Sequence, residues 1–406
     1  MLLKKVYFAD ANKLRWGGKQ PALKNRRISS QRGAKKKIKG CAVDSWRIVL
    51  KNQILILFLS LIGLLFINSL AYGQWTSVPP PSVSTDWFLY GVCFTSPSEG
   101  WAVGGNNANR RAVLLRYSGS TWTSVPPPSV STDWFLYDIH FTSSGEGWAV
   151  GGDDTNHRGV LLHCSGGAWT SVIPPSVSKN WGLGGVHFTS PSDGWAVGYD
   201  PINRRGVLLR YFGGAWTSVI PPSVSAAWDL YGVHFPSANE GWAVGRDVIN
   251  HRGVLLRYSG GAWTSVIIPS VSTNWHLRGV GFASSSEGWA VGEDSANRRG
   301  ILLRYSGGSW TSVPAPSVSK DWWLNGVRFT SSGEGWAVGR DSTNRAGVLL
   351  RYSGGAWTSV NFPSVSPDWE LGGVHFTSPT EGWAVGEDSS NHRGVLFRFV
   401  LPATKS

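Results

Sequence analysis

The sequence predicts an all-β fold, a seven-bladed β-propeller with four-stranded blades, and three observations lead to this prediction. From residue 75 onward, one unit of 47 residues is repeated seven times without a slip in the period. A period of this size with regularly placed glycine and aromatic residues is typical of a propeller blade. Each unit holds four short apolar runs separated by Ser, Pro, Gly and Asn, and none has helical periodicity over ten residues.

Tryptophan marks the repeat most clearly, because 21 of the 24 Trp residues fall into three columns of seven. The first column opens a Trp-Thr-Ser-Val run at Trp75, and the second opens a Trp-Ala-Val-Gly run at Trp101. The third column consists of Trp87, Trp134, Trp181, Trp228, Trp275, Trp322 and Trp369. The Trp, Val, Leu and Phe columns are expected to pack the blades against each other.

The four strands of the first unit are expected at residues 89–95, 101–104, 113–117 and 122–125. The seventh blade is split between the two ends of the repeat region. We therefore expect the Trp75 run to pair as an outer strand with the last strand of the chain, at residues 395–399. Such pairing would close the ring and remove its open sheet edges.

The basic charge belongs to the beginning of the chain. The formal net charge is +13, and residues 1–51 hold 15 Lys and Arg against two acids. The remainder is neutral, which excludes the basic footprint of a nucleic-acid-binding domain. We interpret residues 1–51 as a basic leader, which a start codon assigned too early would explain. Residues 52–73 fit a signal peptide or membrane anchor, 74–401 the propeller and 402–406 a tail, so the chain is expected to be exported.

The repeat motif Glu-Gly-Trp-Ala-Val-Gly, a hairpin, and then Leu-Leu-Arg-Tyr-Ser-Gly-Gly-x-Trp carries a family resemblance over residues 75–400. It resembles the BNR/Asp-box-like repeats of the photosystem II stability and assembly factor family and of exported bacterial propellers. The resemblance implies a protein partner. The Asp of an Asp-box is replaced here by Tyr or Cys, as at Tyr117 and Cys164, which departs from the sialidase pattern.

One acid stands two residues before each Trp of the second column. These acids are Glu99, Glu146, Asp193, Glu240, Glu287, Glu334 and Glu381. Paired carboxylates would suit glycoside cleavage, but each acid is expected to face a basic residue on the next strand in a cross-strand ion pair. The expected partners are Arg116, His163, Arg210, Arg257, Arg304, Arg351 and Arg398.

The hairpin between the second and third strands has the pattern Asp-x-x-Asn-(Arg/His)-Arg-Gly in most copies. Its Asn suits an Asx turn or a left-handed backbone position. Its Asp resembles a calcium ligand, but the alternating ligand spacing and the closing Glu are missing. The final Arg either pairs with this Asp or is available to a ligand. This column is Arg111, Arg158, Arg205, Arg252, Arg299 and Arg393.

Strand alternation places these hairpins and the connections between blades on one rim, and the chain ends on the opposite rim. The third Trp column is expected on the rim that bears the hairpins and the connections between blades. Its rings are candidate platforms for a sugar or a peptide, and the alternative is that they cap the gaps between blades.

Two positions beside the third Trp column differ strongly between copies. The position after the Trp is Phe88, Phe135, Gly182, Asp229, His276, Trp323 and Glu370. Two residues further on stand Tyr90, Tyr137, Gly184, Tyr231, Arg278, Asn325 and Gly372. This diversity would build one asymmetric central site, with Asp229, His276, Arg278, Trp323 and Glu370 as candidate ligand-binding residues. The alternative is relaxed packing on an exposed surface.

No cofactor, metal or catalytic residue is predicted, because no triad order, phosphate loop or zinc spacing is present. One inner-strand column holds Cys93, His140, His187, His234, Gly281, Arg328 and His375. Hydrogen-bonded packing is favoured over a metal ring there, since Arg328 shares the column. Cys93 and Cys164 are interpreted as isolated substitutions and not as a disulfide framework.

These observations favour an exported, non-enzymatic propeller, expected to be a monomer, that serves as a protein-binding or assembly scaffold through its loop-bearing rim. The first alternative is a carbohydrate-binding lectin that uses the Trp platforms. The second is a degenerate sialidase-like glycoside hydrolase. The expected partner is thus a protein or a glycan and not a nucleic acid, with the membrane contacted only through the N-terminal segment.

Overall fold

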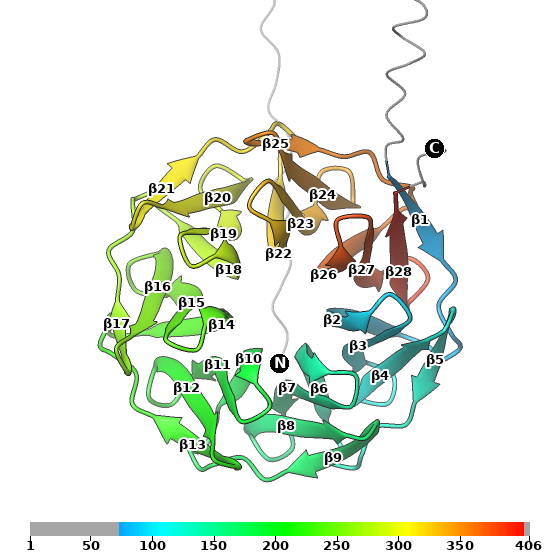
Figure 1. Cartoon of the computed structure of the whole chain (residues 1–406), viewed down its shortest axis with the longest axis horizontal. Coiled ribbons are helices and arrows are strands. Elements are labelled where there is room, and N and C mark those ends of the chain that lie inside the picture. The colour runs from blue at the N-terminus through cyan, green and yellow to red at the C-terminus, as the bar shows by residue number, and fades with distance from the viewer. Residues whose placement is uncertain (1–72, 402–406) are drawn as a thin grey trace, which may run out of the picture. The chain divides into compact units, whose positions relative to one another are not determined.

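The computed structural model describes residues 73–401, which form twenty-eight strands in seven four-stranded antiparallel sheets. The sheets stand around a central axis as the blades of a propeller (Figure 1), so the predicted fold class is confirmed. The predicted leader, signal or anchor segment and tail lie outside the described residues, apart from Gly73 at the end of the signal or anchor segment. Residues 73–401 contain no helix, and hence none that would be long and apolar enough to cross a membrane.

The four strands of each blade are ordered from the central axis outward. The innermost strands are β2 (Trp87–Ser96), β6 (Trp134–Ser143), β10 (Gly182–Ser190), β14 (Trp228–Ser237), β18 (Trp275–Ser284), β22 (Trp322–Ser331) and β26 (Trp369–Ser378). The second strands are β3 (Glu99–Asn106), β7 (Glu146–Asp153), β11 (Asp193–Asp200), β15 (Glu240–Asp247), β19 (Glu287–Asp294), β23 (Glu334–Asp341) and β27 (Glu381–Asp388). The third strands are β4 (Arg111–Ser118), β8 (Arg158–Ser165), β12 (Arg205–Phe212), β16 (Arg252–Ser259), β20 (Arg299–Ser306), β24 (Ala346–Ser353) and β28 (Arg393–Val400). The outer strands are β1 (Gln74–Val78), β5 (Thr121–Val125), β9 (Ala168–Val172), β13 (Ala215–Val219), β17 (Ala262–Ser265), β21 (Ser309–Val313) and β25 (Ala356–Ser359).

The ring closes as predicted. β1 pairs antiparallel with β28, and Trp75 lies opposite Phe399. The first strand of the repeat region therefore completes the blade formed by β26, β27 and β28 (Figure 1). Because this blade contains strands from both ends of the region, the edge of β28 is paired and does not remain open.

Six of the seven inner strands begin two residues earlier than the sequence pattern indicates, and β10 begins one residue earlier. The backbone N–H of Trp87 donates to the carbonyl oxygen of His392 in the preceding blade, at 3.2 Å, which fixes Trp87 as the start of β2. The pairing of β2 with β3 then skips Tyr90, between Leu89 and Gly91. Such a bulge re-aims a side chain, and Tyr90 lines the central cavity of the ring.

The core lies between neighbouring blades. The buried ring of Trp101 stacks on Phe141 of the next blade, with 6.0 Å between centroids and 6° between planes. Trp169 of the same next blade meets Trp101 edge-on at 5.4 Å. A Cβ atom at Gly104 would lie 1.9 Å from the carbonyl oxygen of Phe88, so the Trp-Ala-Val-Gly motif needs its glycine for close strand packing.

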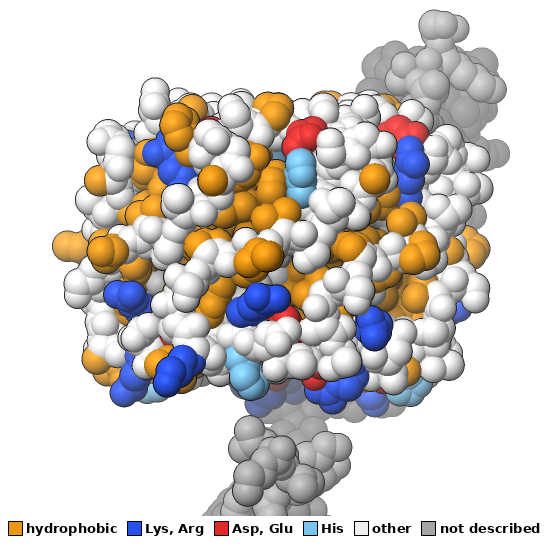
Figure 2. All heavy atoms as spheres, turned by 90° about the horizontal axis from the view of Figure 1, so that it is seen from below, with side chains coloured by type: hydrophobic (Ala, Val, Ile, Leu, Met, Phe, Trp, Pro, Cys, Tyr) orange, Lys and Arg blue, Asp and Glu red, His pale blue; other side chains and the backbone are white. Residues whose placement is uncertain are grey.

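The two rims of the ring differ, as predicted. We call the rim that bears the β3–β4 type hairpins and the connections between blades the loop rim. On it, the N–H of Trp134 donates to the carbonyl oxygen of Arg110 at 3.0 Å. Gln74 pairs with Val400 at the opposite rim, so the described chain enters and leaves there. Figure 2 shows hydrophobic side chains over the outer wall and basic side chains gathered near one edge.

Candidate ligand-binding funnel

The third Trp column lies in the core and does not form exposed platforms. Its seven rings are between 0% and 3% exposed. Trp87 lies against Gly394 of the preceding blade, where a Cβ atom would come within 2.3 Å of the ring. The platform interpretation is therefore corrected in favour of the alternative that these Trp residues cap the gaps between blades.

Most of the hairpin arginines form ion pairs with buried aspartates of the same hairpin. Contacts of 3.3–3.6 Å join Arg158, Arg252, Arg299 and Arg393 to Asp153, Asp247, Asp294 and Asp388, whose carboxylates are almost completely buried. Arg111 lies opposite the uncharged Asn106, and Arg205 lies opposite Asp200 without an ion pair within 4 Å. Because most of the column is engaged in the hairpins, it is a structural feature of each blade and not a shared ligand surface.

The hairpin aspartate organises its own turn. In the blade formed by β14 to β17, the Asp247 carboxylate accepts from the Asn250 backbone N–H at 3.0 Å and from its side-chain amide at 2.7 Å. Burial acts to raise the pKa of Asp247, but hydrogen bonds from Asn250 and Ser225 outweigh it and lower the pKa overall. The left-handed position expected at Asn is occupied by the next residue, His251 at φ 51°. These carboxylates are thus committed to protein donors, and the structure groups no three His, Cys, Asp or Glu of residues 73–401 for a metal ion.

The acids before the second Trp column form the predicted cross-strand pairs. All seven contact the basic residue expected for them. Glu240 and Arg257 approach to 2.8 Å, and the Arg257 guanidinium also lies 5.4 Å from the centre of the Trp242 ring. Every member of this column therefore has the same structural partner, in line with the interpretation preferred over catalysis.

The two variable positions converge on one funnel at the mouth of the central channel. This cavity of about 550 Å³ is lined by Tyr90, Tyr137, Gly184, Tyr199, Tyr231, Arg246, His276, Arg278, Trp323, Asn325, Glu370 and Gly372. Four of the predicted site residues line it directly, namely His276, Arg278, Trp323 and Glu370. The fifth, Asp229, reaches it through its ion pair with Arg246, at 3.4 Å. The structure therefore brings the asymmetric residues of the seven blades together.

One side of the funnel is aromatic. Tyr90 and Tyr137 line the cavity, and Phe88 packs against Tyr90 and Phe135 without lining it; we call these four residues the aromatic wall. The ring centroids of Tyr90 and Tyr137 are 5.7 Å apart, and those of Phe88 and Phe135 are 6.0 Å apart. Burial, followed by the charge of Glu370, raises the pKa of Tyr90 to about 12, so its phenol keeps its proton and can donate.

The other side, which we call the charged wall, holds ion pairs. Arg278 contacts Glu293 at 2.9 Å, and its guanidinium lies 5.8 Å from the centre of the Trp323 ring. Burial, followed by the nearby Arg278, lowers the pKa of His276 to about 4, so this imidazole is neutral at pH 7. The charged wall thus offers fixed guanidinium and carboxylate groups beside an aromatic ring.

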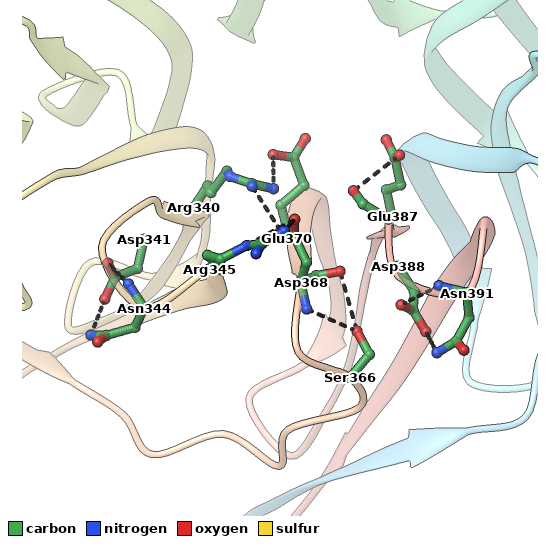
Figure 3. Close-up of polar contacts among 11 residues, drawn as sticks. Arg340, Asp341, Asn344, Arg345, Ser366, Asp368, Glu370, Glu387, Asp388 and Asn391 are labelled. Carbon is green, nitrogen blue, oxygen red and sulfur yellow. Dashed lines mark hydrogen bonds and ion pairs between the residues drawn. The ribbon is translucent and has the colours of Figure 1, made fainter. Parts of the chain in front are cut away.

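The charged wall continues into the last two blades, shown in Figure 3. Arg340 reaches both Asp368, at 2.8 Å, and Glu370, at 3.2 Å. Glu387 has only the Ser389 hydroxyl as a donor, at 3.2 Å, and no basic nitrogen within 4 Å among the described residues. Burial, followed by the charge of Glu370, raises the pKa of Glu387. Glu387, which lies opposite the lining residue Glu370 on the neighbouring strand, is therefore the carboxylate beside the funnel that lacks a cation.

A third variable column was missed by the sequence analysis. It lies opposite the first one across the β2–β3 type pairing, and it consists of Gly105, Gly152, Tyr199, Arg246, Glu293, Arg340 and Glu387. Gly105 accommodates aromatic neighbours, since a Cβ atom there would lie 2.2 Å from the Phe135 ring, whereas Arg246 neutralises Asp229. The signal was present in the sequence, because this position varies between a constant Gly and a residue that is Asp in every unit but the first, where it is Asn106.

No protein-family model matches the chain, and no curated protein matches it. Solved structures do share its architecture. YCF48 bound to D1 peptide is 18% identical, with a TM-score of 0.57 over 82% of this chain and 98% of that one. YCF48 from Cyanidioschyzon merolae is 18% identical, with a TM-score of 0.56 over 80% and 98%. The GH74 xyloglucanase from Xanthomonas campestris is 14% identical, with a TM-score of 0.53 over 77% of this chain and 53% of that one.

At these identities the similarity shows the fold alone. It confirms the expected resemblance to propellers of the photosystem II assembly factor type at the level of architecture. One neighbour is named as a glycoside hydrolase, so the architecture does not by itself separate binding proteins from enzymes. The described chain is a seven-bladed β-propeller with one asymmetric funnel at its axis.

Proposed function

We propose that this protein is an exported, non-enzymatic scaffold whose funnel binds a polypeptide segment of a partner protein. The observation that supports the proposal is the gathering of the variable columns in one cavity, while the remaining contacts are repeated from blade to blade. A site that differs between most blades can orient an asymmetric ligand, which a seven-fold symmetric site cannot do.

The chemistry of the two walls suits a peptide. The aromatic wall offers apolar faces and the Tyr90 and Tyr137 hydroxyls, and Arg278 and Trp323 offer a guanidinium beside an indole. A peptide brings apolar side chains, amides and charges in one ligand, and Tyr, Trp and Arg are the side chains enriched at energetically important protein contacts. One solved structure with this architecture is YCF48 bound to D1 peptide, which makes a peptide the first class to test.

A binding role is preferred to hydrolysis because most of the acids at this site are already neutralised. Glu293 is held by Arg278, and Glu370 by Arg340. Glu387 alone lacks a cation, and we propose that it receives a basic group of the partner. Export is proposed from the sequence of residues 52–73. Because Gln74 lies at the opposite rim, the funnel would face away from the point where the chain enters the propeller.

The proposal is tested by screening the full chain against a displayed peptide library and a glycan array. Arg278→Gln and Trp323→Ala are expected to weaken peptide binding by about tenfold each. Arg257→Gln is the matched control, because Arg257 is also a half-exposed arginine in an ion pair but lies at the opposite rim. Glycan binding that is lost in the two funnel variants would replace this proposal by the lectin alternative. Glycoside turnover that is lost in Glu387→Gln would replace it by an enzyme, and peptide binding unaffected by the funnel variants would overturn it.

A further inference from the structure

A second cavity follows the axis beneath the funnel. It has a volume of about 200 Å³ and is lined by the inner strands of all seven blades. Its wall contains Asp138 and six members of the inner-strand column described above, namely Cys93, His140, His187, His234, Arg328 and His375. The seventh member of that column, Gly281, does not line the cavity. We call this cavity the channel. Its volume exceeds the ~30 Å³ that one water molecule occupies in the liquid, so it has room for a small polyatomic group.

Arg328 brings a cation into the channel without a matching anion. No carboxylate among the described residues lies within 4 Å of its guanidinium; its one side-chain contact is Nη2 to Nε2 of His375, at 3.3 Å. In contrast, Arg257 at the opposite rim has Glu240 at 2.8 Å. Burial lowers the pKa of Arg328, yet a guanidinium remains protonated in proteins. The channel therefore holds a buried guanidinium that has no ion-pair partner within 4 Å among the described residues.

His375 adds a second N–H donor beside the Arg328 guanidinium. Its Nδ1 lies 3.3 Å from the backbone N–H of Phe94, which can only donate. A neutral imidazole carries one proton, so accepting from Phe94 places that proton on Nε2. The Nε2–H and the Arg328 N–H groups then face the same space, two donors with no acceptor between them. Burial and the charge of Arg328 hold the pKa of His375 well below its ordinary value, so the ring is neutral.

Three further imidazoles continue the same ring of side chains. The rings of His140 and His187 are 4.3 Å apart, and those of His187 and His234 are 4.5 Å apart. Their buried Nδ1 atoms have no hydrogen-bond partner. Burial, followed by Arg328, lowers the pKa of His140 to about 3, so these rings do not compete with Arg328 for a neutralising charge at pH 7.

Asp138 is the only acid of the channel wall. Its two carboxylate oxygens accept from the backbone N–H groups of Ile139, at 2.8 Å, and Val186, at 2.9 Å. The carboxylate is therefore satisfied by the backbone and forms no ion pair with Arg328. Burial raises the pKa of Asp138 to about 6.

We propose that the channel binds a small oxyanion, such as sulfate, phosphate or a carboxylate, with the Arg328 guanidinium and the His375 Nε2–H as its main donors. Converging charged and neutral N–H donors are the arrangement that oxyanions prefer. A metal ion does not fit the same residues, since the guanidinium repels cations and the structure groups no three metal-ligating side chains in residues 73–401. This inference does not depend on the proposed peptide binding, because a free anion tests it without a partner.

The test is calorimetric titration of the full chain with sulfate and, in a second arm, with acetate, at constant ionic strength against chloride. Saturable binding of either anion is expected, and Arg328→Gln should weaken it by about tenfold or more. Arg328→Lys should retain part of the affinity, and Arg257→Gln should leave it unchanged. Sulfate binding alone indicates a free tetrahedral anion, whereas acetate binding alone indicates the carboxylate of a larger ligand. Binding of neither anion, or equal binding by Arg328→Gln in a folded protein, overturns the proposal.

The pH dependence gives a second measurement, since sulfate itself does not titrate near neutral pH. Among the groups that face the channel, the four imidazoles titrate far below this range, and burial raises the pKa of Cys93 to about 11. Tyr90, Tyr137 and Tyr231 at the mouth titrate above it. The side chain of Arg278 also lines the channel there. Asp138 alone changes charge near pH 6, so sulfate should bind several-fold more tightly at about pH 5.5 than at about pH 7.5. Asp138→Gly, which matches the other six blades, should abolish this difference, and an unchanged pH profile in that variant would contradict the assignment.

Discussion

The opposite rim and the funnel are built on the same repeats in opposite ways. At the opposite rim each blade repeats one contact, an acid beside a basic side chain, as in Glu240 with Arg257. In the funnel no two neighbouring blades beyond the first pair present the same side chain, from the aromatic wall to Arg340 and Glu387. The constant columns therefore hold the ring together. The variable columns occupy positions that tolerate substitution, and they make the funnel asymmetric.

The strongest test of this comparison uses tryptophans from the two kinds of column. Trp242 is 1% exposed and stacks on Phe282 of the next blade, whereas Trp323 stands at the funnel surface. Trp242→Ala should lower the free energy of unfolding by about 3–5 kcal/mol, through lost burial and a cavity. Trp323→Ala should cost less than about 1 kcal/mol, because its ring is partly exposed. Denaturant unfolding followed by circular dichroism measures both, and equal losses would erase the distinction between the columns.

The second test compares two kinds of aspartate through pH. Asp138 has a folded-state pKa of about 6, above its ordinary 3.8, so its contribution to stability is complete below pH 3.8 and is lost as pH rises through 6. Asp247 has a lowered pKa, so its contribution is present above pH 3.8 and is lost as pH falls through its folded value. The Asp138 shift corresponds to at most ~3 kcal/mol.

The variants separate these two windows. Asp138→Gly should remove the loss of stability between about pH 4 and about pH 6, and Asp247→Asn should reduce the loss in acid. Thermal unfolding from about pH 3 to about pH 7 is the measurement. If the wild-type protein and Asp138→Gly lose the same stability between about pH 4 and about pH 6, burial does not destabilise the ionised Asp138 carboxyl.

The third test concerns binding. Arg278→Gln should weaken a funnel ligand by about tenfold, or about 1.4 kcal/mol, and leave the unfolding midpoint nearly unchanged. Arg257→Gln should leave the affinity unchanged. Fluorescence anisotropy with a labelled peptide from the library measures both affinities. Equal affinity of the two variants would remove the functional contrast between the funnel and the opposite rim.

The smallest expected effect is at the repeated ion pair. Glu240→Gln should lower the free energy of unfolding by about 0.5–1 kcal/mol, since Arg257 is partly exposed and water screens the pair. A double-mutant cycle with Arg257→Gln isolates the coupling between the two side chains. A coupling energy of several kcal/mol would show that the rim pairs contribute more to ring stability than their exposure indicates.

The sequence predicted much of the fold because its repeats are local and regular. The blade count and the pairing of the Trp75 strand with the Phe399 strand followed from the period and from where the repeat region begins and ends. The acid and basic columns could be matched because antiparallel pairing makes them diagonal neighbours, with Glu240 opposite Ser259 and Arg257 opposite Trp242. The site was predicted only in part: His276, Arg278, Trp323 and Glu370 line the funnel, as expected for residues that differ between copies.

The third Trp column shows why the rest could not be predicted. Whether Trp87 is exposed depends on Gly394, a residue of the neighbouring blade that comes close only when the ring closes. The Tyr90 side chain reaches the axis through a bulge, which is a break in the pairing register that strict alternation does not reveal. Position 105 and its counterparts were missed because each acts on the residue opposite it on the neighbouring strand, where it fills space or neutralises a charge. This role becomes visible only when the two strands are paired.

By itself, the sequence determined the number of blades, the closure of the ring and the rim pairs, because these depend on period and on strand neighbours. The tertiary structure alone decided that the third Trp column is buried, that the variable columns form a single funnel, and that Arg328 stands in the channel without an ion-pair partner. The physical reason is that seven blades meet at one axis. Residues about 47 positions apart become neighbours there. How far each side chain is buried, and whether its charge is neutralised, therefore depends on side chains of the other blades.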